Sequence, residues 1–209
     1  MIKTGWKKTA TLLAGVLLVL CAVTVSAETI LLDAPLWLQK DERWRDVYLN
    51  VDGGEERTIG QAGCTLCCLA SAESLRTGKE VTPFDMLFRV EFSGDDLHWP
   101  KEYEVLARTK KGMLSRQAAP LLLACLRCGR PALVGLYSKE RGSHWVLVYG
   151  CQDLEPDDPQ LSQFLIRDPG TQGRTTLDQV RTYFPLIRVI RTYDITEELR
   201  AAVRAAAEG

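Results

Sequence analysis

The chain has 209 residues, of which 46% are hydrophobic and 25% are charged. This composition is typical of a globular protein and excludes a disordered or fibrous chain, and the length suits one domain of ordinary size. The 26 basic and 27 acidic residues nearly balance, and no run of lysine or arginine marks a nucleic-acid groove. We therefore expect no nucleic-acid partner.

The first 27 residues have the pattern of a secretory signal peptide. A basic start over residues 3–8 precedes an uncharged apolar stretch over 9–24, and the tripeptide Val-Ser-Ala at 25–27 supplies small residues at a cleavage site. The stretch is short for a bilayer span, which needs about 20 residues. Cys21 suggests a lipoprotein, but the leucine before it is too large for a lipobox. We predict a secreted or extracytoplasmic protein cleaved after Ala27, with membrane contact only through an uncleaved signal segment.

Six cysteines follow the predicted cleavage site: Cys64, Cys67, Cys68, Cys125, Cys128 and Cys151. An even count in an exported chain suggests disulfides, but the three clustered cysteines include an adjacent pair, which rarely bridges. Two Cys-x-x-Cys pairs, at 64–67 and 125–128, resemble the halves of a zinc knuckle. They lie much farther apart in the chain than the roughly 12 to 20 residues usual for structural zinc. We expect most of these thiols to be buried, and no metal or cofactor.

Helices are expected in the first half of the mature chain. A glycine-punctuated loop over 58–63 precedes a helix over 64–76, whose first two turns are apolar or small on every side, so this helix should be buried centrally. Shorter helices are expected over 82–88 and 121–128. Residues 93–112 are polar and show no clear pattern.

Strands dominate the second half. Runs rich in Val, Ile, Leu and Tyr predict four strands, over 132–137, 144–151, 163–167 and 186–192. A short helix is expected over 175–184, and a closing helix from Thr196. Helices followed by strands indicate an α+β domain with an antiparallel sheet. A helical lobe would then form one side of a cleft and the sheet the other.

Cys64 has a position suited to chemistry, because it follows Gly63 and begins the buried helix. A helix N-terminus carries a partial positive charge and unpaired N–H groups. Both favour a thiolate, and the same N–H groups could hold an oxyanion formed on an attacked carbonyl. The alternative is a structural cysteine buried at a helix start.

The chain has only two histidines, His98 and His144. His98 lies in a polar loop and is expected at the surface. His144 begins an apolar strand, where it either caps the strand edge or finds a thiol and a carboxylate as partners. Asp168 ends another strand and precedes Pro-Gly, which is also an ordinary turn. Together with Cys64 these residues give the order Cys, His, Asp of a papain-like thiol hydrolase.

Four segments, in this order, carry a family resemblance: Gln39-x-x-x-x-Trp44, TIGQAGCTL at 58–66, HWVLVYG at 144–150 and IRDPG at 166–170. They resemble the C39-like peptidases, a papain-like family whose best-known branch processes bacteriocins. The resemblance spans about 34–192 within a peptidase domain over 28–209 that ends in a helix over about 196–208. It implies a papain-like cysteine peptidase fold, in which a helical lobe with a buried nucleophile helix packs on an antiparallel sheet.

The resemblance assigns Cys64 as nucleophile, His144 as general base and Asp168 as the residue that orients the imidazole. The family also uses an upstream glutamine as an oxyanion donor. The position six residues before the cysteine holds threonine here, so the candidates are Gln39, which we favour, and Gln61. The double-glycine leader substrates of the processing branch are not carried over.

The expected function is that of an exported cysteine peptidase or thiol acyl-hydrolase, which cleaves amide bonds of a peptide or protein substrate without a cofactor. A cell-wall peptidoglycan endopeptidase or amidase would use the same residues. An alternative of another class is a catalytically silent module that holds peptides in the same cleft. A cysteine-bound metal module is a third.

Overall fold

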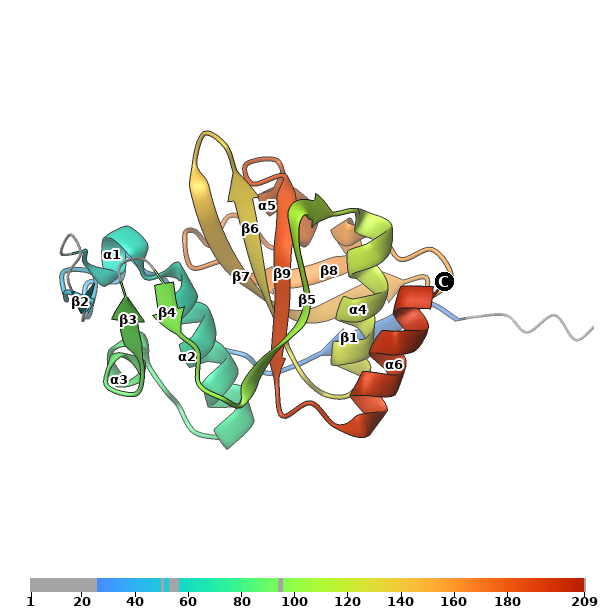
Figure 1. Ribbon diagram of the computed structural model, residues 1–209, viewed down its shortest axis with the longest axis horizontal. Helices are drawn as coiled ribbons and strands as arrows, with labels where there is room; N and C mark the ends of the chain where they lie inside the picture. Colours follow the sequence, from blue (N-terminus) through green and yellow to red (C-terminus); the bar gives the residue numbers. More distant parts are fainter. Residues whose placement is uncertain (1–25, 50, 53–56, 94–95, 209) are drawn as a thin grey trace, which may run out of the picture.

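The computed structural model describes residues 26–49, 51–52, 57–93 and 96–208. Nearly all of the predicted signal peptide, residues 1–25, lies outside the described residues. None of the helices in the described part of the chain is long and apolar enough to cross a membrane. Figure 1 shows a small region of short helices and strands beside a larger region built on an antiparallel sheet.

The large sheet contains six strands, and all of its pairs are antiparallel. Its order is β1 (Glu28–Leu31), β7 (Gly142–Leu154), β6 (Ala132–Ser138), β9 (Leu186–Tyr193) and β5 (Tyr103–Met113), and β8 (Phe164–Arg167) also pairs with β7. The short helices η1 (Leu161–Gln163) and α5 (Leu177–Arg181) flank β8 in the chain.

Both faces of this sheet are covered. On one face, alternate residues such as Val134 and Val146 pack under α4 (Ser115–Arg127), with α6 (Glu197–Glu208) beside it. On the other face, Leu133 and Leu147 pack against α2 (Cys64–Thr77). Strands that are buried on both faces have continuous apolar sequences, which is why β6 and β7 could be recognised.

The small region surrounds the N-terminal end of α2. It contains α1 (Ile59–Ala62), α3 (Pro83–Leu87) and a three-stranded sheet of β2 (Val51–Asp52), β3 (Glu91–Ser93) and β4 (Asp96–His98). Its core joins α2 to the aromatic rings of Trp37 and Trp44, which meet edge to face at 5.7 Å.

The expected α+β class with an antiparallel sheet is confirmed, and most expected elements are found within a few residues of their predicted bounds. The helix expected over 121–128 begins earlier, at Ser115, and includes Pro120. The sequence predicted no element over residues 93–112, where the structure has much of β5. This strand is last in the sheet order, so among the described strands it has a partner on one side only, and four of its 11 residues are exposed.

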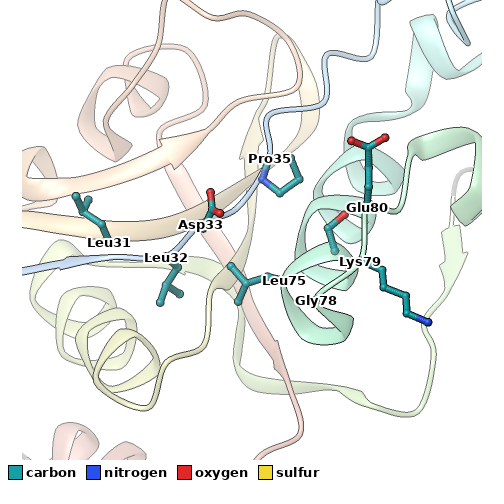
Figure 2. A pocket seen from close by; sticks show the side chains of 9 residues that line it. Leu31, Leu32, Asp33, Pro35, Leu75, Gly78, Lys79 and Glu80 are labelled. Carbon is teal, nitrogen blue, oxygen red and sulfur yellow. The ribbon is translucent and has the colours of Figure 1, made fainter.

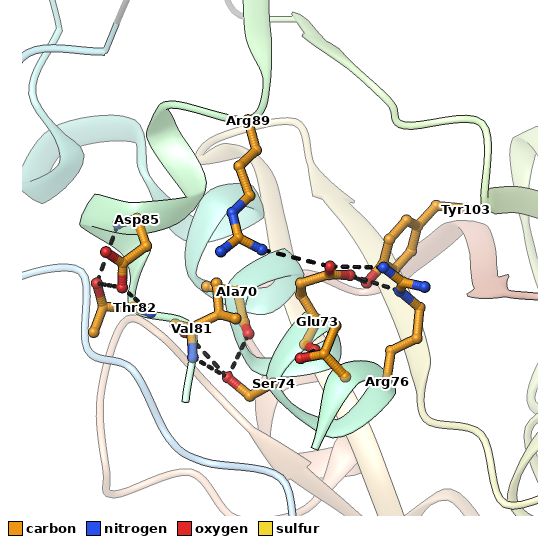
Figure 3. A network of polar contacts seen from close by, with 10 residues as sticks. Ala70, Glu73, Ser74, Arg76, Val81, Thr82, Asp85, Arg89 and Tyr103 are labelled. Atoms are coloured by element: carbon orange, nitrogen blue, oxygen red, sulfur yellow. Dashed lines mark hydrogen bonds and ion pairs between the residues drawn. The ribbon is translucent and has the colours of Figure 1, made fainter. Parts of the chain in front are cut away.

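A polar network fixes the second half of α2 (Figure 3). The buried carboxylate of Glu73 accepts two hydrogen bonds from Arg76, each 2.8 Å, and one of 3.0 Å from the Tyr103 hydroxyl, and it lies 3.7 Å from Arg89. Burial alone would raise the pKa of Glu73, but these donors outweigh it and the pKa is lowered. The network ties α2 to β5 and to the segment after α3.

Candidate active site

The backbone around Gly63 sets the position of Cys64. Gly63 ends α1 and begins α2, and its N–H donates to the carbonyl of Ile59 at 2.8 Å. A Cβ at Gly63 would lie only 2.5 Å from that oxygen, so a larger residue does not fit. Cys64 therefore occupies the first turn of α2, where backbone N–H groups have no acceptor within the helix.

His144 and Asp168 come together because β7 and β8 are paired, with Leu147 opposite Arg167. His144 Nε2 lies 2.8 Å from Asp168 Oδ1, which also accepts a 2.8 Å hydrogen bond from the N–H of Gly170. The two side chains are 9% and 0% exposed. The ring of Phe184 stacks on the imidazole with a centroid distance of 4.9 Å. The carboxylate of Asp168 and the ring of Phe184 therefore fix the orientation of the imidazole.

The remaining nitrogen of His144, Nδ1, is left for the thiol of Cys64. Burial would lower the pKa of His144, but hydrogen bonds to Asp168 and Cys64 outweigh it and raise the pKa to about 9. Burial would raise the pKa of Cys64, but the hydrogen bond and charge of His144, with the backbone of Trp145, lower it overall. Both shifts favour a thiolate–imidazolium pair.

The other described cysteines differ in this respect. Burial raises the pKa of all five, which are Cys67, Cys68, Cys125, Cys128 and Cys151. The pKa of Cys125 is raised to about 12. All are free thiols, and four of the five are buried, as expected. Cys67 and Cys125, one from each Cys-x-x-Cys pair, belong to cores on opposite faces of the sheet. No group of three or more His, Cys, Asp or Glu residues in the described part of the chain could hold a metal ion.

Arg174 is a site residue that the sequence analysis missed. Its Nε lies 2.6 Å from Asp168 Oδ2, in an ion pair without the alignment of a hydrogen bond, and its side chain is 19% exposed. The contact is crowded: a Cβ on Gly170 would lie 3.0 Å from Arg174 Nη2 and 3.4 Å from His144 Cε1. The carboxylate therefore has a cation on one oxygen and the imidazole on the other.

A cavity of about 520 Å³ opens beside Cys64 and His144. Both candidate glutamines line it. Gln39 donates its side-chain amide to the carbonyl of Gly60 at 3.0 Å, and its backbone N–H donates to Pro169 at 2.9 Å. Gln61 is exposed and accepts a hydrogen bond from the Thr58 N–H at 3.0 Å, which caps α1. Gly60 belongs to α1, a short helix in the segment over 58–63 that the sequence predicted to be a loop. Gln39 is therefore anchored between α1 and the turn after Asp168.

The alternative acid–base residues lie elsewhere. His98 is exposed, as the sequence predicted, but it lies on β4 and not in a loop; its Nδ1 is 3.8 Å from the carboxylate of Glu91. Asp153, the next candidate for the carboxylate if Asp168 were only a turn residue, is on β7 nine residues beyond His144, which corresponds to about 30 Å of strand. Its backbone N–H donates to Thr29.

A cavity of about 540 Å³ lies at the other end of α2 (Figure 2). It is lined by Leu75, Gly78 and Lys79, with Leu31 at the end of β1 and Asp33 just after it. No thiol or imidazole lines it, and the hydroxyl of Ser74 is hydrogen-bonded to Ala70 and Val81. Since α2 has 14 residues, this cavity is separated from Cys64 by about 20 Å of helix.

Comparisons of the chain with protein-family models, with curated proteins and with solved structures found no match. The function proposed below therefore rests on the geometry of the site and on the sequence motifs that resemble the C39-like peptidases.

Proposed function

We propose that the protein is a cysteine peptidase, or a related thiol acyl-hydrolase, with Cys64 as its nucleophile. The observation that carries the proposal is the connected set of Cys64, His144 and Asp168 beside one cavity, in which the thiol pKa is lowered and the imidazole pKa raised. Opposite shifts in two neighbouring titratable groups are typical of an acid–base pair used in catalysis.

The reaction proceeds through an acyl-enzyme. The thiolate of Cys64 attacks the carbonyl carbon of an amide, and a carbon–sulfur bond forms. His144 Nδ1 gives its proton to the leaving nitrogen as the carbon–nitrogen bond breaks. His144 then removes a proton from water, which attacks the thioester and releases the carboxylic acid and the thiolate. Asp168 holds the ring with Nδ1 toward the thiol throughout.

The negative charge on the attacked oxygen needs donors near Cys64. The N–H groups of the first turn of α2 are oriented for this role, and a side-chain amide of the cavity can add a second donor. We assign that second donor to Gln39, with Gln61 as the alternative, because Gln39 is anchored to both halves of the site.

A papain-like fold of the C39-like kind is part of the proposal. It is supported by the placement of the three residues: the thiol begins a buried helix, and its partners lie on strands of the antiparallel sheet against which that helix packs. Secretion stays a prediction from residues 1–27, on the sequence pattern alone.

The test is to alkylate the folded protein with iodoacetamide near neutral pH and to map the modified cysteines. Cys64 should react fastest, because the thiolate fraction and the exposure of a cysteine control its rate. Cys128, the other partly exposed thiol, is the internal control because its pKa is raised. Equal labelling of Cys64 and Cys128 would refute the nucleophile assignment.

Turnover separates an enzyme from a silent peptide-binding module. Pools of internally quenched peptides should be cleaved by the wild-type chain, and Cys64→Ala should bind the same peptides without cleaving them. Selective alkylation of Cys64 without cleavage of any pool would favour the binding module.

A further inference from the structure

A second hollow adjoins the cavity that contains Cys64 and His144. Its volume is about 380 Å³, and it is lined by Arg141, Thr171, Gly173, Arg174 and Tyr183. Arg141 lines both cavities and stands three residues before His144, in the turn between β6 and β7. The hollow therefore continues the candidate active site on the side of the imidazole and Asp168.

Two guanidinium groups line this hollow, and both lie near the same aromatic ring. Arg141 and Arg174 lie 5.5 Å and 5.1 Å from the centroid of the same Tyr183 ring. Arg174 is fixed through Nε by Asp168. Arg141 is exposed, and among the described residues it forms no ion pair within 4 Å. Its neighbour Glu140 accepts a 2.7 Å hydrogen bond from Ser138 instead.

The residues that line the two cavities, as far as the structure describes them, include arginines but no aspartate or glutamate. The whole chain, in contrast, has nearly equal numbers of acidic and basic residues. Asp168 balances the charge of Arg174, but no described carboxylate pairs with Arg141, so the hollow has an excess of guanidinium charge. Such an excess favours an anion, and the planar guanidinium matches a carboxylate by paired hydrogen bonds.

We infer that this hollow binds a carboxylate of the substrate on the leaving-group side of the scissile bond. The inference rests on the proposed function: His144 protonates the leaving nitrogen, so the leaving part of the substrate lies beside the imidazole and hence beside Arg141 and Arg174. The substrate is thus a peptide with an acidic group soon after the scissile bond. Either an acidic side chain or a free C-terminus would supply it.

The first experiment needs no known substrate. It compares the rates at which Cys64 reacts with iodoacetate, which carries a carboxylate, and with iodoacetamide, its neutral analogue. In both reactions a sulfur–carbon bond forms and iodide leaves. The rate with iodoacetate divided by the rate with iodoacetamide should be larger for Cys64 than for a small free thiol. This ratio should fall as salt is added, because salt screens the charge of the arginines.

Arg141→Gln is the test variant and Lys139→Gln the matched control, since Lys139 is an exposed cation of the same turn that lines neither cavity. Arg174 is not used, because its loss would also disturb Asp168. We expect Arg141→Gln to lower the iodoacetate-to-iodoacetamide ratio about fivefold, the size of one partly exposed charge interaction. Lys139→Gln should leave the ratio near the wild-type value.

The outcomes distinguish the two proposals. If Cys64 reacts with neither reagent faster than Cys128, the proposed function fails and the carboxylate site fails with it. If Cys64 reacts rapidly but the ratio is unchanged in Arg141→Gln, or falls equally in Lys139→Gln, only the carboxylate site is wrong.

Peptide pools then identify the source of the carboxylate. Faster cleavage of amidated peptides with Asp or Glu after the scissile bond, compared with Asn or Gln, would assign an acidic side chain. Faster cleavage only with a free C-terminus would assign the terminal carboxylate. Cleavage that is indifferent to both would overturn the inference.

Discussion

Asp168 and Glu73 are both buried carboxylates beside an arginine, yet the two clusters around them differ in what they can do. The oxygens of Glu73 accept aligned hydrogen bonds from Arg76 and Tyr103. Asp168 divides its oxygens between the imidazole of His144 and an arginine whose ion pair lacks hydrogen-bond alignment. The cluster around Glu73 holds α2 against β5 and the segment after α3. The cluster around Asp168 connects a carboxylate, through the titratable ring of His144, to the thiol of Cys64.

The pKa directions express the same difference. Around Glu73, the pKa of the carboxyl is lowered while those of Tyr103 and Arg76 are raised, so each group keeps one protonation state near neutral pH. Around Asp168, the pKa values of Cys64 and His144 are shifted toward each other's usual range. Burial and ion pairing alone therefore do not mark a functional site, whereas a titratable pair at a cavity does.

The largest effect is expected for His144→Ala. The variant lacks the proton carrier and the charge that keeps Cys64 ionised, so turnover should fall by about 10³-fold or more. Alkylation of Cys64 should slow in the same protein. His98→Ala is the control and should change neither rate. If His144→Ala kept its activity, the contrast between the two clusters would disappear.

Substitution of Asp168 should have the next largest effect. Asp168→Ala removes the acceptor for Nε2 and leaves Arg174 without its partner, and we expect turnover to fall by about 10²-fold. Asp168→Asn keeps an oxygen acceptor for the ring and should lose less. Peptide hydrolysis measures the order, with a thermal melt to check folding. Full activity in Asp168→Ala would show that Asp168 is only a turn residue.

Glu73→Gln sharpens the comparison from the other side. We expect a loss of about 1 to 3 kcal/mol in the free energy of unfolding, because Arg76 and Tyr103 lose a charged acceptor. The alkylation rate of Cys64 should be unchanged at a temperature where the variant is folded.

The same variant has a pH signature in urea unfolding. Because the pKa of Glu73 is lowered by folding, its contribution is present above the unfolded value of about 4.3 and is lost as the pH falls through the folded value. The stability difference between wild type and Glu73→Gln should therefore shrink below about pH 4. A difference that stayed constant with pH would contradict the charged role of Glu73.

A shift of the pH profile is the smallest of these effects. Alkylation of Cys64 should extend to lower pH than that of Cys128, since the pKa of Cys64 is lowered and that of Cys128 raised. Hydrolysis should decline on the alkaline side near pH 9, where His144 loses its proton. A profile of Cys64 alkylation that matched Cys128 would leave no electrostatic difference between the two thiols.

The sequence predicted those parts of the fold whose pattern is decided locally. The first two turns of α2, most of β6 and the centre of β7 have apolar or small residues because they are buried. The sequence did not predict β5, because β5 is at the edge of the sheet and has exposed polar residues such as Lys110 and Lys111 in place of an apolar pattern. Its partner, β9, lies some 80 residues later in the chain.

The candidate site was predictable only in part for a similar reason. The pattern locates the elements that carry the three predicted residues: Cys64 begins α2, His144 lies near the start of β7, and Asp168 follows the end of β8. Arg174 lies in a polar stretch after Asp168 that has the sequence of an ordinary turn. Phe184 lies in a short amphipathic segment, where nothing in the sequence distinguishes it from its neighbours. Only the folded arrangement brings these two side chains to the imidazole and its carboxylate.

The placement of the three residues on α2, β7 and the end of β8 has a consequence for the life of the chain. The elements meet only when α2 packs on β7 and β8 pairs beside it, so the charge that lowers the thiol pKa is absent before the sheet is assembled. An unfolded chain carries Cys64 as an ordinary thiol with a pKa of about 8.5. During synthesis, and during any passage through a translocation channel, the protein would be chemically latent, and its reactivity would arise together with its native structure.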